Sequence, residues 1–380
     1  MKKLYLVATV LLLLLLLAVS CSPPPAQAPA PSTTVPGPVS RPTSNLSPPT
    51  SQDAAWAKVI EAAKKEGKVT LYSFNFTGDV GTNIARAFQQ RYGISMDIIT
   101  GRGAEFLERL KVEYRIGQVL ADFMEGSQTH MINVKRAGQS VSMADIPVFQ
   151  EKDVWVMDPF VLDPDRHVIS YTYSVRSPFI NTDMVKSADE PHAWKDLLDP
   201  RWKGKMVIGD PVLSSTPYLN FIPLLNQKIL DVEYMRALGR QDMRFVTGDR
   251  QVGEALSRKE VPLTPVGTSL VIADFAREGV PVKPLDMEEG IIVGTVGAVV
   301  LAKSPHPNAG KLFMNWLMSE EGQNTVSQAK ATPPIRKGVP DGSPPSVRMK
   351  VKKLIPTSTE DAEDAAIKFS DKFLVPLWKK

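Results

Sequence analysis

The stretch "KVTLYSFNFTGDVGTNIARAFQQRYGISMDIITG" (68–101) carries the alternation that decides the fold. Residues 68–74 are mostly β-branched and aromatic, which predicts a strand. Residues 75–93 place apolar side chains at helical spacing, and residues 94–101 are again typical of a strand. Because strand, helix and strand follow one another at short spacing, we expect a parallel sheet with helices on both faces.

The same alternation continues on both sides of this stretch. An amphipathic helix is predicted over 53–67, and a third helix and a third strand over 103–118 and 121–126. Further strands are predicted over 167–182, 205–211 and 290–304, and further helices over 214–225, 234–241, 251–260, 270–279, 307–329 and 361–373. The fold class is therefore α/β.

Two of the β runs, 167–182 and 290–304, are longer than the others and divide the α/β blocks. If both cross between two lobes, they form a hinge beside an interlobe cleft, which is a common ligand-closing geometry. The predicted parts are lobe 1 over 53–170 plus 296–335, and lobe 2 over 171–295 plus 336–380. The run at 167–182 stops at Pro178 or just beyond.

The N-terminus predicts export and a lipid anchor. Lys2 and Lys3 precede an apolar run over 4–19, the layout of a secretory signal peptide (1–20). The quartet Ala18-Val19-Ser20-Cys21 resembles a bacterial lipobox, which implies that Cys21 is lipidated, with a palmitate-type chain, and tethers the protein to a bacterial membrane. A plain signal peptide or an uncleaved anchor is the alternative.

Residues 21–52 join this tether to the globular body. They are rich in proline, serine and threonine, a composition that favours extended, solvated chain. Cys21 is the only cysteine, so no disulfide is expected in the body. The protein is therefore predicted to be extracytoplasmic and held off the membrane by a linker.

Composition and motifs exclude several function classes. The net charge is +4, and 45 Lys and Arg are mixed with 41 Asp and Glu, so no basic stripe predicts a nucleic-acid partner. The four histidines have no zinc spacing, and no phosphate loop, GxSxG elbow or CxxC pair occurs. We predict no enzyme, no resident metal and no cofactor, and we expect His306 to support the loop before the helix at 307–329.

Candidate ligand contacts lie where strands give way to helices, because helix N-termini point N–H groups beyond the carboxyl ends of strands. These turns hold Ser73, Thr77, Gly78, Arg102, Gly103, Glu105, Ser127, Asp210, Ser214, Ser215 and Thr216. Hydroxyls, amides and Arg102 favour a small anion or carboxylate. Asp79, Glu105 and Asp210 would equally suit a polyamine, and helix capping is the alternative for each residue. Tyr173 is assigned to the cleft, with hinge packing as its alternative.

Six segments in register resemble a known family. They are "WAKVIEAAKKEGKVTLYS", "AFQQRYGISMDI", "ERLKVEYRIGQVLADF", "WKDLLDPRWKGKMVIGDP", "EGVPVKPLDMEEG" and "SPHPNAGKLFMNWLMSEEGQ". Together they are similar to the extracellular solute-binding proteins of ABC importers, in the group that binds ferric iron, thiamine and polyamines. The resemblance implies a two-lobe type II periplasmic-binding fold and an importer permease as partner, and we expect a monomer.

The same resemblance allows a test for iron. Ferric-binding relatives use two adjacent tyrosines before the segment that matches "ADFAREG", where this chain has Leu270 and Val271. Tyr171 and Tyr173 are the nearest pair and alternate along a β run. Direct dityrosyl iron binding is therefore not expected, while iron held with an exogenous chelator is left open.

The leading hypothesis is a lipid-anchored receptor that captures a small ligand by lobe closure and delivers it to an ABC importer. Two alternatives come from other classes. One is an exported hydrolase that uses carboxylates in the same cleft, and the other is a ligand-sensing subunit that signals to a membrane kinase.

Overall fold

The computed structural model describes residues 51–378 except 162, 214–215, 350–352 and 357–374. The predicted signal peptide, Cys21, the linker up to residue 50, Ser214, Ser215 and the helix predicted over 361–373 lie outside these described residues. The described residues belong to a single unit of the chain. No helix among the described residues is both long and apolar enough to span a bilayer.

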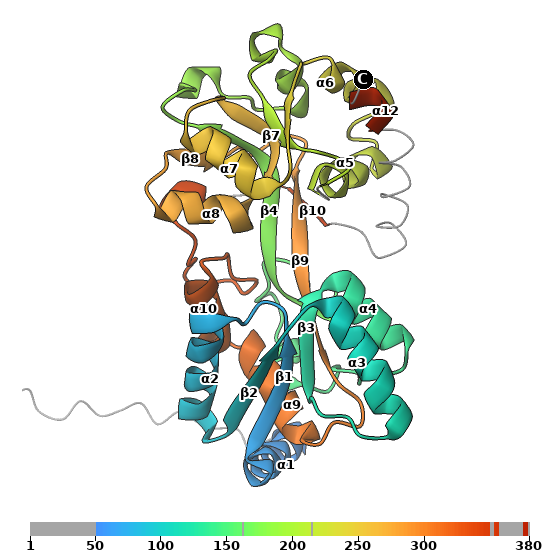
Figure 1. The fold of residues 1–380 in the computed structure, drawn as a ribbon. Coiled ribbons are helices and arrows are strands. Elements are labelled where there is room, and N and C mark those ends of the chain that lie inside the picture. Colours follow the sequence, from blue (N-terminus) through green and yellow to red (C-terminus); the bar gives the residue numbers. More distant parts are fainter. Residues whose placement is uncertain (1–50, 162, 214–215, 350–352, 357–374, 379–380) are drawn as a thin grey trace, which may run out of the picture. The chain divides into compact units, whose positions relative to one another are not determined.

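The N-terminal elements form the predicted parallel layer (Figure 1). Strand β1 (Lys68–Ser73) pairs in parallel with β2 (Ser95–Thr100) on one side and β3 (Phe123–Ser127) on the other. Successive β1 side chains face opposite layers: Leu71 packs toward α1, α2, α9 and α10, and Tyr72 toward α3 and α4. The helices of this part are α1 (Ser51–Glu66), α2 (Gly78–Tyr92), α3 (Gly103–Ile116), α4 (Gln128–Arg136), α9 (Pro307–Met318) and α10 (Glu320–Lys330).

Two long strands continue the sheet beyond β3. Strand β9 (Ile291–Val300) pairs antiparallel with β3 and with β4 (Ile169–Asn181), in the register Ser170↔Gly297 and Arg176↔Ile292. Strands β7 (Leu263–Thr268) and β8 (Val282–Pro284) pair with β4, and β10 (Leu354–Pro356) pairs with β9. Within the described residues the result is one mixed sheet of eight strands, in which β1, β2 and β3 keep the parallel pattern expected from the sequence and β10 lies parallel to β9.

The remaining elements build a second core around the other end of β4 and β9. They are α5 (Thr216–Asn226), α6 (Val232–Gly239), α7 (Asp249–Ser257), α8 (Ser269–Arg277), α12 (Val375–Trp378), a small sheet of β5 (Val207–Gly209) with β6 (Arg244–Val246), and the 3₁₀ turns η2 (Ser187–Asp189), η3 (Trp194–Leu198), η4 (Pro200–Trp202) and η5 (Pro345–Val347). Trp194, Phe221 and Trp378 are buried together in this core. The 3₁₀ turn η1 (Pro147–Gln150) packs in the first core. The predicted lobe boundaries stay a prediction.

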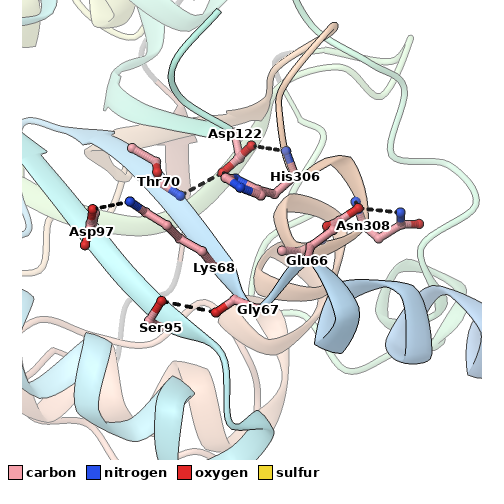
Figure 2. Close-up of polar contacts among 10 residues, drawn as sticks. Glu66, Gly67, Lys68, Thr70, Ser95, Asp97, Asp122, His306 and Asn308 are labelled. Carbon is pink, nitrogen blue, oxygen red and sulfur yellow. Dashed lines mark hydrogen bonds and ion pairs between the residues drawn. The ribbon is translucent and has the colours of Figure 1, made fainter.

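Two carboxylates accept hydrogen bonds near the amino ends of β1 and β3 (Figure 2). Buried Asp122 accepts hydrogen bonds from the backbone N–H of Thr70 at 2.7 Å and of His306 at 2.7 Å, and its Oδ2 lies 3.0 Å from His306 Nδ1. Glu66 accepts from the N–H of Ala309 at 2.7 Å and from Asn308 Nδ2 at 2.7 Å, at the start of α9. His306 therefore supports the entry to α9, as the sequence predicted.

Candidate ligand-binding site

The turns after β1 and β3 meet at a buried carboxylate on the carboxyl edge of the sheet. Glu125 of β3 is fully buried and accepts a hydrogen bond from Ser73 Oγ at the end of β1. It also accepts from the backbone N–H and the Nδ2 of Asn75, each at 2.6 Å, and from Tyr171 Oη at 2.9 Å. Four donors therefore satisfy both oxygens of the carboxylate, which holds the turn after β1 against β3 and β4.

Two further side chains set the electrostatics around Glu125. Burial raises the pKa of Tyr171 well above its ordinary value, and the negative charge of Glu125 adds to the shift, so this phenol is neutral at pH 7. The Lys330 ammonium lies 5.9 Å from the centroid of the Tyr171 ring. Burial lowers the pKa of Lys330, while the charge of Glu125 opposes this shift.

The N-termini of α3 and α4 converge beside this cluster. Ser127 is the residue before α4, and its Oγ lies 2.6 Å from His130 Nδ1. A Cβ atom at Gly103, the first residue of α3, would lie only 2.3 Å from the same Nδ1. The start of α3 therefore has no room for a side chain at this position while the His130 imidazole stays in place. Helix N-termini carry partial positive charge, so their convergence favours an anion at this edge.

Gln128 gives this edge a buried polar group with no partner. It is the first residue of α4 and is 8% exposed. Neither Oε1 nor Nε2 has a hydrogen-bond partner among the described residues. The side chain lies over β9, where a Cβ at Gly297 would come within 2.8 Å of Oε1. An amide buried in this way costs free energy unless a further polar group pairs with it.

The other predicted residues of lobe 1 lie along the same edge but are not drawn into this cluster. Thr77 is the N-cap residue of α2, and Gly78 has a positive φ of 52° and lines a pocket of about 250 Å³ beside Phe76 and Thr100. Arg102 is 84% exposed, and its Nε lies 3.9 Å from the Glu105 carboxylate. This exposed pair contributes little to stability.

Two of the predicted residues of lobe 2, Asp210 and Tyr173, are buried. Asp210 is buried, and its Oδ1 accepts from the backbone N–H of Val212 at 2.8 Å in the turn after β5. Thr216 is the first residue of α5. Tyr173 is buried in the second core, and burial raises its pKa to about 12, with the charge of Asp341 adding to the shift. Its role in ligand binding stays a prediction.

Asn75, Glu125 and Lys330 were not singled out from the sequence, whereas Tyr171 was considered together with Tyr173 in the test for iron. Glu125 left a signal, because it is the single charged residue within the otherwise buried run 123–126. A carboxylate inside a buried strand needs dedicated donors. Lys330 left no signal, since it ends an amphipathic helix 205 positions away in a chain rich in lysine.

The described residues contain no group of three or more His, Cys, Asp or Glu side chains that could hold a metal ion. Both tyrosines nearest the site are buried and neutral, with Tyr171 donating to Glu125. Within this part of the chain, the side chains fit a ligand that brings its own anionic groups better than a bare cation.

Comparison with known proteins places the chain among binding proteins. A model of the family described as bacterial extracellular solute-binding protein matches residues 142–354. Iron uptake protein A1 of Synechocystis is 24% identical over 300 residues, which cover 75% of this chain and 80% of that protein.

Two solved structures illustrate the fold. The Trichodesmium protein IdiA (FutA), in complex with iron and citrate ligands, matches with a TM-score of 0.66 at 18% identity, covering 82% of this chain and 100% of that chain. The periplasmic binding protein AfuA of Actinobacillus pleuropneumoniae, with exogenous fructose-6-phosphate bound, matches with a TM-score of 0.59 at 19% identity, covering 81% and 98%. The chain therefore has the two-lobe type II periplasmic-binding fold.

Proposed function

This chain belongs to the bacterial extracellular solute-binding proteins, the receptors of ABC importers, and on that premise we propose that it captures a small anion or carboxylate. The family is one of binding proteins and not of enzymes, so an exported hydrolase is not retained. In this proposal the ligand sits at the carboxyl edge of β1 and β3, lobe closure completes its contacts, and an importer permease receives it.

The observation that carries the choice of an anion is the convergence of α3 and α4. Gly103 and His130 bring the two helix starts together, and the Gln128 amide lies at the same edge with no partner among the described residues. Backbone N–H groups and an amide are neutral donors that suit a carboxylate or phosphate oxygen. A polyamine would meet the positive ends of both helix dipoles.

Ferric iron is the second candidate, in the form of a chelate. Iron uptake protein A1 and the iron and citrate complex of the Trichodesmium protein support it. AfuA, which holds fructose-6-phosphate, supports a ligand without iron. Citrate and a sugar phosphate share anionic oxygens, so both structures support a ligand with anionic oxygens.

The test is a thermal-shift panel on the full-length chain in mild detergent. It compares citrate, ferric citrate, phosphate, fructose-6-phosphate, thiamine and spermidine. A ligand at 100 times its Kd stabilises the folded state by about 2.7 kcal/mol, a shift of a few degrees in Tm. A saturable shift with citrate or phosphate supports the anion, and a shift with ferric citrate alone supports the chelate. A shift with spermidine alone contradicts both.

We also propose that Cys21 carries the lipid anchor and that residues 21–52 are the linker. The support is the lipobox-like sequence at 18–21 and the proline-rich composition that follows. Labelled palmitate should enter the wild-type chain and not Cys21→Ser, and only the wild type should pellet with membranes. Equal labelling of both chains would refute the anchor. A sensor role would appear as ligand-dependent signalling without solute uptake.

A further inference from the structure

Lys330 places a positive charge at the cluster around Glu125. It is the last residue of α10, and its ammonium lies over the ring of Tyr171 at 5.9 Å from the centroid. The hydroxyl of that tyrosine donates to Glu125, whose second oxygen accepts from Ser73 at the end of β1. Lys330 therefore lies at the carboxyl edge of β1 and β3, where the ligand is proposed to bind.

Glu125 cannot serve as a direct contact for a ligand. Its two oxygens already accept four hydrogen bonds, from Ser73, from Tyr171 and twice from Asn75. It is also fully buried. Its negative charge acts on its surroundings, but its lone pairs are occupied.

Lys330 differs from Glu125 in its hydrogen bonding. Within the described part of the chain its Nζ has no hydrogen bond and no ion pair, and it lies over the ring of Tyr171. The side chain is partly exposed, so a solute can reach it. Removing an ammonium from water without giving it an acceptor costs free energy. Burial lowers the pKa of Lys330, and the charge of Glu125 counteracts that shift and favours the ammonium form.

We propose that Lys330 is the cationic ligand contact of this receptor and that it selects a ligand with a carboxylate or phosphate group. This inference rests on the proposed function and adds the residue that sets the sign of the ligand's charge. Glu125 positions Tyr171 beneath the ammonium, and the ammonium meets an oxyanion held at the starts of α3 and α4. A polyamine would bring like charge to Lys330 and is rejected.

Three variants test this assignment in the full-length chain. Lys330→Met keeps the aliphatic stem over Tyr171 and removes the charge, and Lys330→Arg keeps the charge. Lys64→Met removes the same charge from an exposed position of α1. The dissociation constants of citrate, ferric citrate, phosphate and spermidine are measured by calorimetry. Comparing citrate with phosphate distinguishes a carboxylate ligand from a phosphate ligand.

We expect Lys330→Met to bind the anion with at least tenfold lower affinity than the wild type. Lys330→Arg should bind it with an affinity within about threefold of the wild type, and Lys64→Met with wild-type affinity. The affinity of the wild type should fall as salt increases. A purely structural Lys330 would lower the Tm of Lys330→Met and leave its Kd unchanged, which would overturn the inference.

The test also separates this inference from the receptor function. If the wild type binds spermidine and no anion, the receptor function stands and the assignment of Lys330 fails. If the wild type binds neither anions nor spermidine and carries no co-purified small solute by native mass spectrometry, both fail. If an anion binds the wild type and Lys330→Met with equal affinity, only the assignment of Lys330 fails.

Discussion

Glu125 shows how a single buried residue fixes the geometry of the candidate site. Its carboxylate accepts from two side chains and one backbone N–H of the turn after β1, and from Tyr171 of β4. A buried carboxylate with this many donors is favourable only while all of them stay in place. The residue therefore joins three strands and orients the ring beneath Lys330.

Glu125→Gln tests this role at nearly constant volume. The amide has one acceptor oxygen, and its NH₂ group would face donors that now point at the carboxylate. We expect a loss of about 3 kcal/mol in the free energy of unfolding, measured by urea denaturation. Exposed Glu288→Gln is the control and should change stability by less than about 0.5 kcal/mol. Equal stability of both variants would contradict the network.

Lys330 gives a prediction for pH. Burial lowers its pKa in the folded chain below the ordinary 10.5, so the unfolded chain binds more protons between the two values. The free energy of unfolding must therefore rise with pH across that window, up to about 10.5. Lys330→Met lacks this contribution, so the stability difference, wild type minus variant, should grow in favour of the wild type from pH 7 to pH 10.

Denaturation at both pH values measures this difference, and Lys64→Met is measured in parallel as the control for removing one exposed charge. A difference that stays constant or shrinks as the pH rises would show that the ammonium of Lys330 is as well solvated in the folded chain as in the unfolded chain.

At the scale of elements, the close approach of α3 and α4 decides where their N–H groups point. Gly103→Ala would place a methyl carbon about 2.3 Å from His130 Nδ1, so the imidazole or one helix start must move. We expect a destabilisation of about 1–3 kcal/mol and at least a tenfold loss of affinity for the bound anion. Calorimetry and urea denaturation measure the two effects.

The matched control is Gly248→Ala, before α7. Gly248 has an extended φ of −179°, and its Cβ would meet no atom closer than Gln251 Oε1 at 3.6 Å. This variant should bind the anion with wild-type affinity. Unchanged affinity in Gly103→Ala as well would show that the helix starts do not contact the ligand.

The elements also show the limits of sequence patterns. The run at 167–182 was expected to stop at Pro178 or just beyond, and β4 ends at Asn181, within that range. Proline is tolerated because the register between β4 and β7 shifts between Ser177 and Phe179, so the missing N–H leaves no gap in a regular ladder. Strand β7 itself was not predicted, because its sequence "LTPVGT" contains proline and glycine.

At the scale of the whole molecule, β4 and β9 connect the two cores. Both lie inside the sheet and are almost entirely buried, and β9 is a nearly continuous apolar run, whereas β4 alternates apolar side chains with buried Ser and Thr. A hinge made of two paired strands allows closure by small dihedral changes at few positions.

Closure makes a prediction for the complete chain. The radius of gyration, measured by small-angle X-ray scattering, should fall when the ligand found in the thermal-shift panel is added to saturation. Spermidine should leave it unchanged. A ligand that raises Tm without changing the radius of gyration would show that binding does not require lobe closure.

The sequence by itself determined the α/β class, the order of most elements and the two long β runs, because these follow from local periodicity and turn chemistry. It also placed Ser73, Gly103 and Ser127 at strand ends, where helix starts follow. Only the tertiary structure decided that Glu125, Tyr171 and Lys330 meet there. They come from β3, β4 and α10, and a contact between distant segments depends on sheet order and helix packing, which no local pattern encodes.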